Sequence, residues 1–208
     1  MRKEHILILA KTRMNTGVCV GGLILNQFEN VRLLTENGDN QPHHTPFEIG
    51  QVYDIEFDYK KPTKLPHRED ILVKKYILQS QSYSIKQIAD FLKDNKLINT
   101  IGNIENLFSG KLKWTQNGTG YIPHNEQIQK SVEFWISDID LFLHTKKYNN
   151  KESIYFYYNN AKRLKFVGLQ TPLKTIKKGT VLRVSLSRLF KKDNIPEGYY
   201  LQLSGWYS

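Results

Sequence analysis

The sequence contains a single cysteine, Cys19, and therefore no Cys-x-x-C pair. This excludes an intrachain disulfide and leaves too few thiolate ligands for a zinc finger. Long apolar runs are also missing: no stretch approaches the roughly 18 residues of a membrane span, and the apolar run behind the charged N-terminus is shorter than a signal-peptide core. We therefore predict a soluble, cytoplasmic protein with no metal, no cofactor and no membrane partner.

Acidic residues are scarce at one end of the chain. The formal charge is +10, and residues 151–208 hold 11 Lys and Arg against 3 Asp and Glu. Residues 1–80 hold 11 against 10, and residues 81–150 hold 8 against 7. An excess concentrated in one segment indicates a surface for a polyanion, which we interpret as nucleic acid. A solvated basic face, or a surface for an acidic protein or a membrane, are the alternatives.

Short strand signals separated by turns make up most of the chain. Hydrophobic residues form 39% of the 208 residues and aromatic residues 12%, which is enough to build a core. Strands are expected at 6–10, 18–25, 31–34, 52–59, 154–158, 163–169, 181–189 and 199–206. We predict a first β module at 1–80, a connector at 81–150 and a second, basic β module at 151–208.

The connector carries the helical signals. Apolar residues recur at three- and four-residue steps in 84–92, behind Ser84, which can cap a helix. A second short helix is expected around 104–108, and a glycine-rich turn at 117–120. The segment 132–143 alternates and contains aromatic residues, which predicts a strand that joins one of the two modules.

Alternation assigns faces to the strands of the basic segment. In the strand 154–158, Tyr155 and Tyr157 occupy the face opposite the core residues. Arg163 and Lys165 take the corresponding positions in the next strand, and Arg183 does so in the strand after it. Rings that stack on bases and cations that contact phosphates are what a platform for single-stranded nucleic acid needs. The alternative is the ordinary wet face of an antiparallel sheet.

Several segments occur in a fixed order along the chain. They are Ile8-Leu9-Ala10-Lys11-Thr12-Arg13, Cys19-Val20-Gly21-Gly22, Val31-Arg32-Leu33-Leu34-Thr35, Tyr53-Asp54-Ile55-Glu56, His67-Arg68-Glu69-Asp70, 155–168, 182–190 and 198–201. In this order they resemble the Dual OB-containing domain family of prokaryotic proteins. The resemblance covers nearly the whole chain apart from its middle. It implies a mainly β fold of two OB-like small barrels with a helical insertion between them, and a nucleic-acid-binding role, often in defence or conflict gene contexts, without a catalytic mechanism.

Two groups of residues suggest chemistry. Cys19 could act as a nucleophile with His67 as its base, but a cysteine flanked by valines in a strand is more often a buried apolar residue. Asp54, Glu56 and Asp58 share one strand face, as in some Mg²⁺-dependent nucleases, yet the same pattern is typical of carboxylates that face water. We therefore predict no catalytic residue and no metal ligand.

The leading hypothesis is a non-enzymatic protein that binds single-stranded DNA or RNA. The segment KTRMNTG is interpreted as the first inter-strand loop of a barrel, and His67 as part of a polar network near Arg13 and Arg32. The predicted nucleic-acid-binding residues are Lys11, Arg13, Arg32, His67, Tyr155, Tyr157, Lys162, Arg163, Lys165, Lys177, Lys178, Arg183 and Arg188. The alternative is an adaptor for a nuclease or helicase partner, with Trp135, Trp206 or Tyr207 as exposed anchors.

Overall fold

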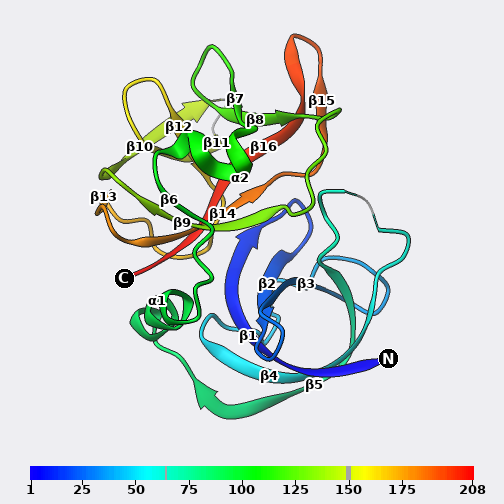
Figure 1. Cartoon of the computed structure of the whole chain (residues 1–208). Coiled ribbons are helices and arrows are strands. Elements are labelled where there is room, and N and C mark those ends of the chain that lie inside the picture. The colour runs from blue at the N-terminus through cyan, green and yellow to red at the C-terminus, as the bar shows by residue number, and fades with distance from the viewer. Residues whose placement is uncertain (64, 149–150) are drawn as a thin grey trace.

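A computed structural model describes residues 1–63, 65–148 and 151–208, and of Tyr148 and Lys151 it describes the backbone alone. The chain forms two β modules that pack against each other (Figure 1). The predicted fold class, mainly β with two OB-like modules, is confirmed. Among the described residues, no helix is long and apolar enough to cross a membrane.

The first module is a closed five-stranded barrel with the strand order β1-β2-β3-β5-β4. Neighbouring strands are antiparallel except for β3 and β5, which run parallel. Its strands are β1 (Arg2–Arg13), β2 (Val18–Ile24), β3 (Glu29–Leu34), β4 (Gln51–Tyr59) and β5 (Asp70–Ser82). A five-stranded barrel with a Greek-key connection is the architecture of an OB-fold.

The second module repeats this order in a larger sheet. Its strands β10-β11-β12-β16-β14 follow one another as β1 to β4 do in the barrel, and β12 and β16 are again parallel. The sheet comprises β6 (Thr100–Gly102), β9 (Val132–Ser137), β10 (Leu141–Tyr148), β11 (Lys151–Tyr157), β12 (Arg163–Phe166), β13 (Thr175–Ile176), β14 (Val181–Leu186) and β16 (Ile195–Tyr207). Three short strands extend it at one end: β7 (Lys113–Trp114), β8 (Gly120–Pro123) and β15 (Phe190–Lys192).

Helical structure is a minor part of the fold. The predicted helix is α1 (Ile85–Asp94), which Ser84 begins with a capping box that pairs it with Gln87. Ile88 and Leu92 are buried on its inner face. The second predicted helix consists of the short turns η1 (Ile104–Asn106) and α2 (Leu107–Gly110). The insertion between the modules is therefore the single helix α1, because the tight turn follows β6 and packs into the core of the second module.

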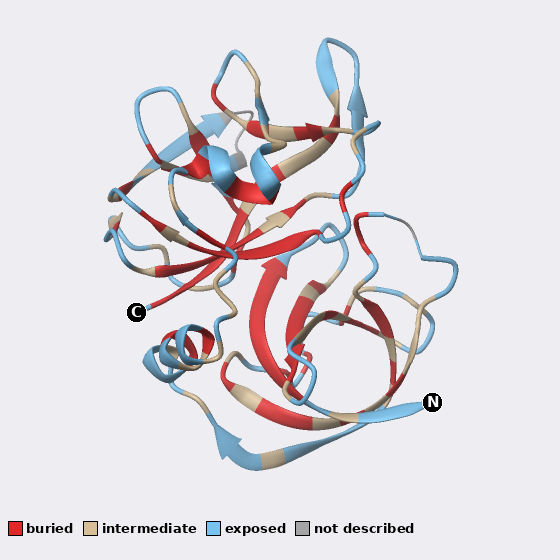
Figure 2. Ribbon diagram, in the orientation of Figure 1, coloured by how far each residue is buried: buried red, intermediate tan, exposed pale blue. Residues whose placement is uncertain are grey.

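The apolar run at the start of the chain is buried on both faces, because β1 contributes to two cores. Ile6 and Ile8 point into the barrel, whereas Leu7 and Leu9 lie in a separate core between the modules. This inter-module core also includes residues of α1, β9, β14 and Tyr207. Figure 2 shows the buried backbone of β1 beside buried strands of the second module. A strand covered on both faces needs no alternation, which explains the continuous apolar run.

Candidate functional site between the two modules

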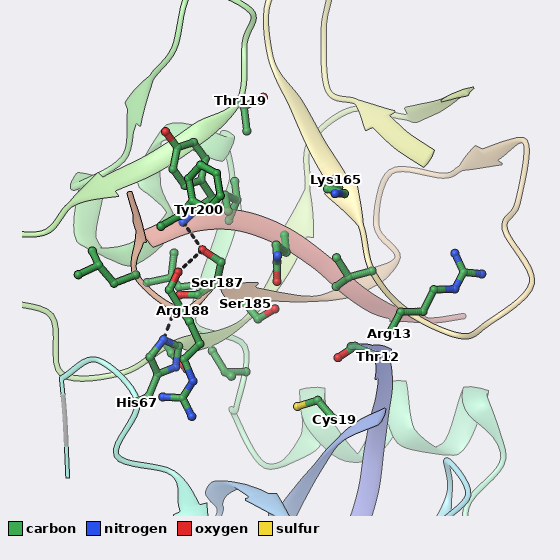
Figure 3. Close-up of a pocket in the computed structure, with 18 of the residues that line it drawn as sticks. Thr12, Arg13, Cys19, His67, Thr119, Lys165, Ser185, Ser187, Arg188 and Tyr200 are labelled. Atoms are coloured by element: carbon green, nitrogen blue, oxygen red, sulfur yellow. Dashed lines mark hydrogen bonds between the residues drawn. The ribbon is translucent and has the colours of Figure 1, made fainter. Parts of the chain in front are cut away.

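A cleft of about 990 Å³ lies where the two modules meet (Figure 3). The barrel contributes the ends of β1 and β2 together with β3 and the segment before β5. The second module contributes β12, β14, β16, the β15 hairpin and the turn at 114–119. In Figure 3, Thr12, Cys19 and His67 approach the cleft from one side, and Ser185, Tyr200 and Lys165 come from the other. The cleft thus exists only because both modules are present.

Seven of the thirteen predicted binding residues line this cleft. They come from both modules: Arg13, Arg32, His67, Tyr155, Lys165, Arg183 and Arg188. Glu69 is the only carboxylate in the lining formed by the described residues. The lining therefore holds five Lys and Arg side chains against one carboxylate, and the charge of two of these arginines is partly offset by Asp70 behind it.

Two of the arginines share one carboxylate. Arg32 Nη2 lies 2.6 Å from Asp70 Oδ2, and Arg188 Nη2 lies 2.8 Å from the same oxygen. Burial raises the pKa of Asp70 and outweighs the opposite effect of Arg32. The Nε atom of Arg32 and the Oδ1 atom of Asp70 are buried and make no hydrogen bond among the described residues. The triad of Arg32, Arg188 and Asp70 therefore carries one net positive charge. The Nε–H group of Arg32 remains available to donate a hydrogen bond.

Arg183 forms the floor of the cleft. It follows Val181 on the face of β14 that is turned toward the barrel, and Val181 lies in the inter-module core. Its Nη1 donates to the hydroxyl of Ser204 at 2.9 Å, and its Nε has no partner among the described residues. The guanidinium lies against β2, where a Cβ on Gly21 would come within 2.6 Å of Nη2. The missing side chain at Gly21 therefore provides the space for Arg183.

Aromatic rings form one wall of the cleft. Trp114, Tyr155, Phe190 and Tyr200 all line it. Tyr200 stacks on Tyr121, with ring centroids 5.6 Å apart and an interplanar angle of 24°, and Phe190 meets Tyr200 edge-on at 5.7 Å. Rings that brace one another keep their exposed faces in fixed positions, which suits stacking on planar ligands.

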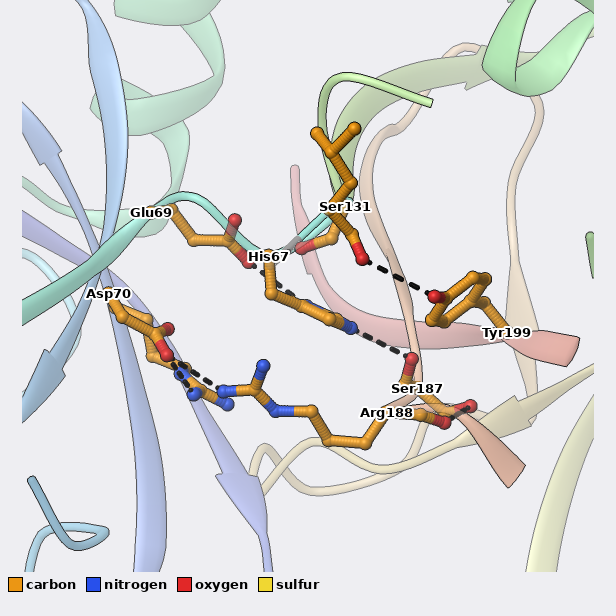
Figure 4. Close-up of polar contacts among 9 residues, drawn as sticks. His67, Glu69, Asp70, Ser131, Ser187, Arg188 and Tyr199 are labelled. Atoms are coloured by element: carbon orange, nitrogen blue, oxygen red, sulfur yellow. Dashed lines mark hydrogen bonds and ion pairs between the residues drawn. The ribbon is translucent and has the colours of Figure 1, made fainter. Parts of the chain in front are cut away.

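The segment before β5 connects the two modules through a polar network (Figure 4). His67 Nε2 lies 3.0 Å from the carbonyl oxygen of Ser187, and His67 Nδ1 lies 3.3 Å from Glu69. Ser131 donates a hydrogen bond to the same carboxylate. Burial alone would raise the pKa of Glu69, but the hydrogen bonds from His67 and Ser131 reverse this and leave its pKa below the ordinary value. His67 therefore links the barrel to the second module through its contact with Ser187.

Cys19 faces the cleft and is half-buried. It is not part of the barrel core, because β2 turns this residue toward the second module. Burial raises the pKa of the Cys19 thiol although Arg32 and Arg183 lower it. Both nitrogens of His67 have partners other than Cys19, so no base is placed to activate the sulfur.

Other predicted binding residues lie behind the wall of the cleft. The guanidinium of Arg163 lies 4.5 Å from the centroid of the Tyr155 ring, and its Nη1 donates to the Tyr157 hydroxyl at 3.0 Å. Lys162 pairs with Glu105 and lies 5.0 Å from the Trp114 ring centroid. These cations hold the aromatic wall in place and do not line the cleft.

The remaining predicted cations lie away from the cleft. Lys11 Nζ pairs with Glu48 at 2.6 Å. Lys177 Nζ pairs with Asp140 at 2.9 Å, and the backbone N–H of Lys178 donates to the same carboxylate at 2.8 Å. The structure therefore does not bring these three residues together with the other seven.

One sequence-based interpretation is wrong, and two residues of the cleft wall were not among the predicted binding residues. The aromatic residues proposed as exposed anchors, Trp135, Trp206 and Tyr207, are buried. They point inward because the strands β9 and β16 are covered by the module core or by the barrel. Conversely, the predicted binding residues did not include Phe190 and Tyr200, although the adjacent tyrosines Tyr199 and Tyr200 at the start of the expected strand 199–206 were a signal for the second of them.

The carboxylates of β4 face away from the cleft, and none of them lines it. The carboxylate of Asp54 is paired with the ring of His5. Within the described parts of the chain, no group of three or more His, Cys, Asp or Glu residues is arranged to hold a metal ion. The features that converge in the cleft are cations, hydroxyls and aromatic rings, and these favour binding of an anionic, ring-containing ligand.

Comparison with known proteins gives one strong match. The family model described as Dual OB-containing domain matches residues 4–206. No curated protein matches the sequence. Among solved structures, the tetrameric p202 HIN2 is 11% identical, with a TM-score of 0.33, and covers 99% of this chain and 90% of that one.

Two further solved structures are similar to the same degree. A murine DNA-binding protein bound to double-stranded DNA is 7% identical, with a TM-score of 0.33, covering 100% of this chain and 94% of that chain. The Ifi202 HINa domain in complex with 20-base-pair double-stranded DNA is 9% identical, with a TM-score of 0.34, covering 98% and 96%. Likeness at this level carries no argument about the function of this chain.

Proposed function

The chain belongs to the Dual OB-containing domain family, and on this premise we propose that the cleft between its two modules binds single-stranded nucleic acid. The observation that carries the proposal is the convergence of five Lys and Arg side chains with a braced aromatic wall in one continuous cavity. The protein acts as a binder: cations neutralise phosphates and aromatic rings stack on bases.

The charge of the cleft supports a phosphate-bearing ligand. Arg13 and Lys165 are exposed in the lining of the cleft where the end of β1 meets the end of β12, and there they can reach a strand that enters it. Arg32 and Arg188 pair with a single carboxylate, Asp70, and Arg183 pairs with no carboxylate among the described residues. A planar guanidinium group can donate two parallel hydrogen bonds to two oxygens of one phosphate group. The arginines of the interior therefore suit a phosphate group better than a monatomic anion.

The shape of the cleft supports single strands over duplexes. Its volume of about 990 Å³ corresponds to a few unstacked nucleotides at most, because ligand pockets of roughly 300–1,000 Å³ enclose single small molecules. Stacking on Tyr200 or Trp114 requires a base whose face is free, and bases in a duplex present only their edges. DNA and RNA strands both meet these requirements.

The test is binding of short single-stranded DNA and RNA, and of a duplex, by fluorescence anisotropy over a salt series. If about four phosphates are neutralised, the log–log salt slope for a single strand is about −3. The variant Arg13→Ala/Lys165→Ala removes two exposed cleft cations, so its slope should be smaller in magnitude by about 1.4. The matched control Lys177→Ala/Lys178→Ala removes the same charge outside the cleft and should keep the wild-type slope.

Three results would contradict the proposal. A binding curve that does not respond to salt would show that phosphate neutralisation is absent. An equal loss of slope in the cleft variant and in the control variant would show that binding follows net charge and not the cleft. Tighter binding of the duplex than of either strand would exclude the single-strand specificity.

A further inference from the structure

The floor of the cleft contains a buried positive charge without a counter-ion. Arg183 is 6% exposed, and its only hydrogen-bond partner on the side chain among the described residues is the neutral hydroxyl of Ser204. None of the residues outside the described ranges is acidic, so no carboxylate is hidden there. A buried charge without a partner costs free energy, and proteins keep such groups where a ligand supplies the opposite charge.

A second guanidinium points to the same place. Arg32 pairs with Gly21 across β2 and β3, so its side chain leaves the sheet on the face where Arg183 lies against Gly21, and each arginine has a buried Nε without a partner among the described residues. The charges around the floor are Arg183 and the triad of Arg32, Arg188 and Asp70. Arg183 contributes one positive charge and the triad contributes another. Glu69 also lines the cleft and adds one negative charge, so the sum around the floor remains positive and favours an anion.

We propose that Arg183 and Arg32 form a subsite for the terminal phosphate monoester of a nucleic-acid strand, a proposal that rests on the function given above. A phosphate monoester carries about 1.5 to 2 negative charges at neutral pH, whereas an internal phosphodiester carries one. An internal phosphate is also attached to a nucleoside on each side. Because Arg183 and Ser204 are nearly inaccessible, a group with a single substituent reaches them far more easily.

Gly21 makes this subsite adjustable without removing a charge. An alanine Cβ at this position would come within 2.6 Å of Nη2 and 3.1 Å of Cζ of Arg183. The backbone of Gly21 is not in the left-handed region, so alanine is tolerated there. Gly21→Ala therefore displaces the guanidinium of Arg183 while the sequence keeps all of its cations.

Cys19 provides a built-in reporter for the subsite. It is the only cysteine in the chain, it lines the cleft, and it senses both guanidinium groups. A phosphate bound between Arg32 and Arg183 would cover the sulfur and also raise its pKa, and both effects slow alkylation. Adenosine monophosphate should therefore reduce the rate of maleimide labelling in proportion to the fraction of sites that it occupies.

The decisive experiment compares one oligothymidylate with a 5′-phosphate, with a 3′-phosphate and with hydroxyls at both ends. One of the phosphorylated ends should bind wild-type protein roughly tenfold tighter than the hydroxyl ends, as a single additional charge-assisted contact gives. Arg183→Met and Gly21→Ala should lose this preference and still bind the strand with hydroxyl ends. Lys177→Met, which removes a charge elsewhere, should keep it.

Folding of the variants can be checked separately. Because Arg183 is buried without a counter-ion, Arg183→Met should have an unchanged or higher melting temperature in the absence of ligand. A melting temperature that falls steeply would mean that Arg183 is also needed for structure, and a Gly21→Ala protein that keeps the end preference would then overturn the subsite. In that case Gly21→Ala gives the independent readout of end preference.

The outcomes separate the two proposals. If wild-type protein binds all three oligonucleotides equally, the subsite is refuted and the single-strand function stands. If no oligonucleotide binds but adenosine monophosphate protects Cys19 in wild type and not in Arg183→Met, the subsite stands as a mononucleotide site and the strand-binding function is refuted. If adenosine monophosphate also fails to protect Cys19, both proposals are refuted.

Discussion

The two modules should unfold as one unit, and this can be tested by weakening one module and observing the other. Ile55 on β4 is fully buried in the core of the barrel. All three tryptophans, at positions 114, 135 and 206, lie in the second module. Tryptophan fluorescence therefore reports on the second module alone, whereas far-UV circular dichroism reports on both.

The size of the effect follows from the cavity that Ile55→Ala creates. Truncating a buried isoleucine to alanine costs about 2–5 kcal/mol. With a central value of about 3 kcal/mol, the melting temperature of a chain of this length falls by about 6–12 °C. The modules are joined by the inter-module core and by the backbone hydrogen bonds from Arg13 to Val167 and from Leu169 to Lys11. The melting temperature measured by tryptophan fluorescence should therefore fall by the same amount.

A matched control lies on the neighbouring strand. Ile77 on β5 is 61% exposed, so Ile77→Ala should change the free energy of unfolding by no more than about 0.5 kcal/mol. If Ile55→Ala lowers the melting temperature of a first transition in circular dichroism and leaves the fluorescence midpoint unchanged, the modules unfold independently. The rigid cleft inferred from their contacts would then have no basis.

Three further predictions concern single side chains. Tyr207→Phe removes the 2.7 Å hydrogen bond to the buried carbonyl of Leu9 and should cost about 1–3 kcal/mol in urea denaturation. Because the pKa of Glu69 is lowered from 4.5, its charged form stabilises the fold above pH 4.5, and this contribution is lost as the pH falls. The melting temperatures of wild type and Glu69→Gln should therefore differ at neutral pH and converge in acid. Tyr200→Ala should weaken single-strand binding by about 1–3 kcal/mol without changing the salt slope, and an unchanged affinity would remove Tyr200 from the contact surface.

Local rules were sufficient to predict many elements of this fold, but not β5, where no strand was expected. The helix predicted at 84–92 is α1, because a capping serine and apolar residues three and four positions apart act within the segment itself. Alternation alone placed Leu182 and Val184 on the core face of their strand, and both lie in the core of the second module. Both signals depend on neighbours in the sequence, and the structure of distant segments does not alter them.

What the sequence could not predict is which of the outer faces are covered. Arg183 alternates with core residues and was expected to face the solvent, yet it is buried against β2 of the barrel. Tyr207 was proposed as an exposed anchor and instead closes the inter-module core. Both errors have the same cause: the docking of one module on the other joins residues far apart in the chain, and no periodicity within a strand records such a contact.

The distribution of charge along the chain differs from the distribution of charge around the cleft. Residues 1–80 are nearly neutral overall, yet they supply Arg13 and Arg32 to the cleft. Their acidic residues on β4 do not line it. The excess of the last segment includes Lys177 and Lys178, which do not reach the cleft either. Net charge per segment sums over all faces of a module, whereas a ligand meets one face, so the relevant quantity is the charge that folding gathers around the cavity.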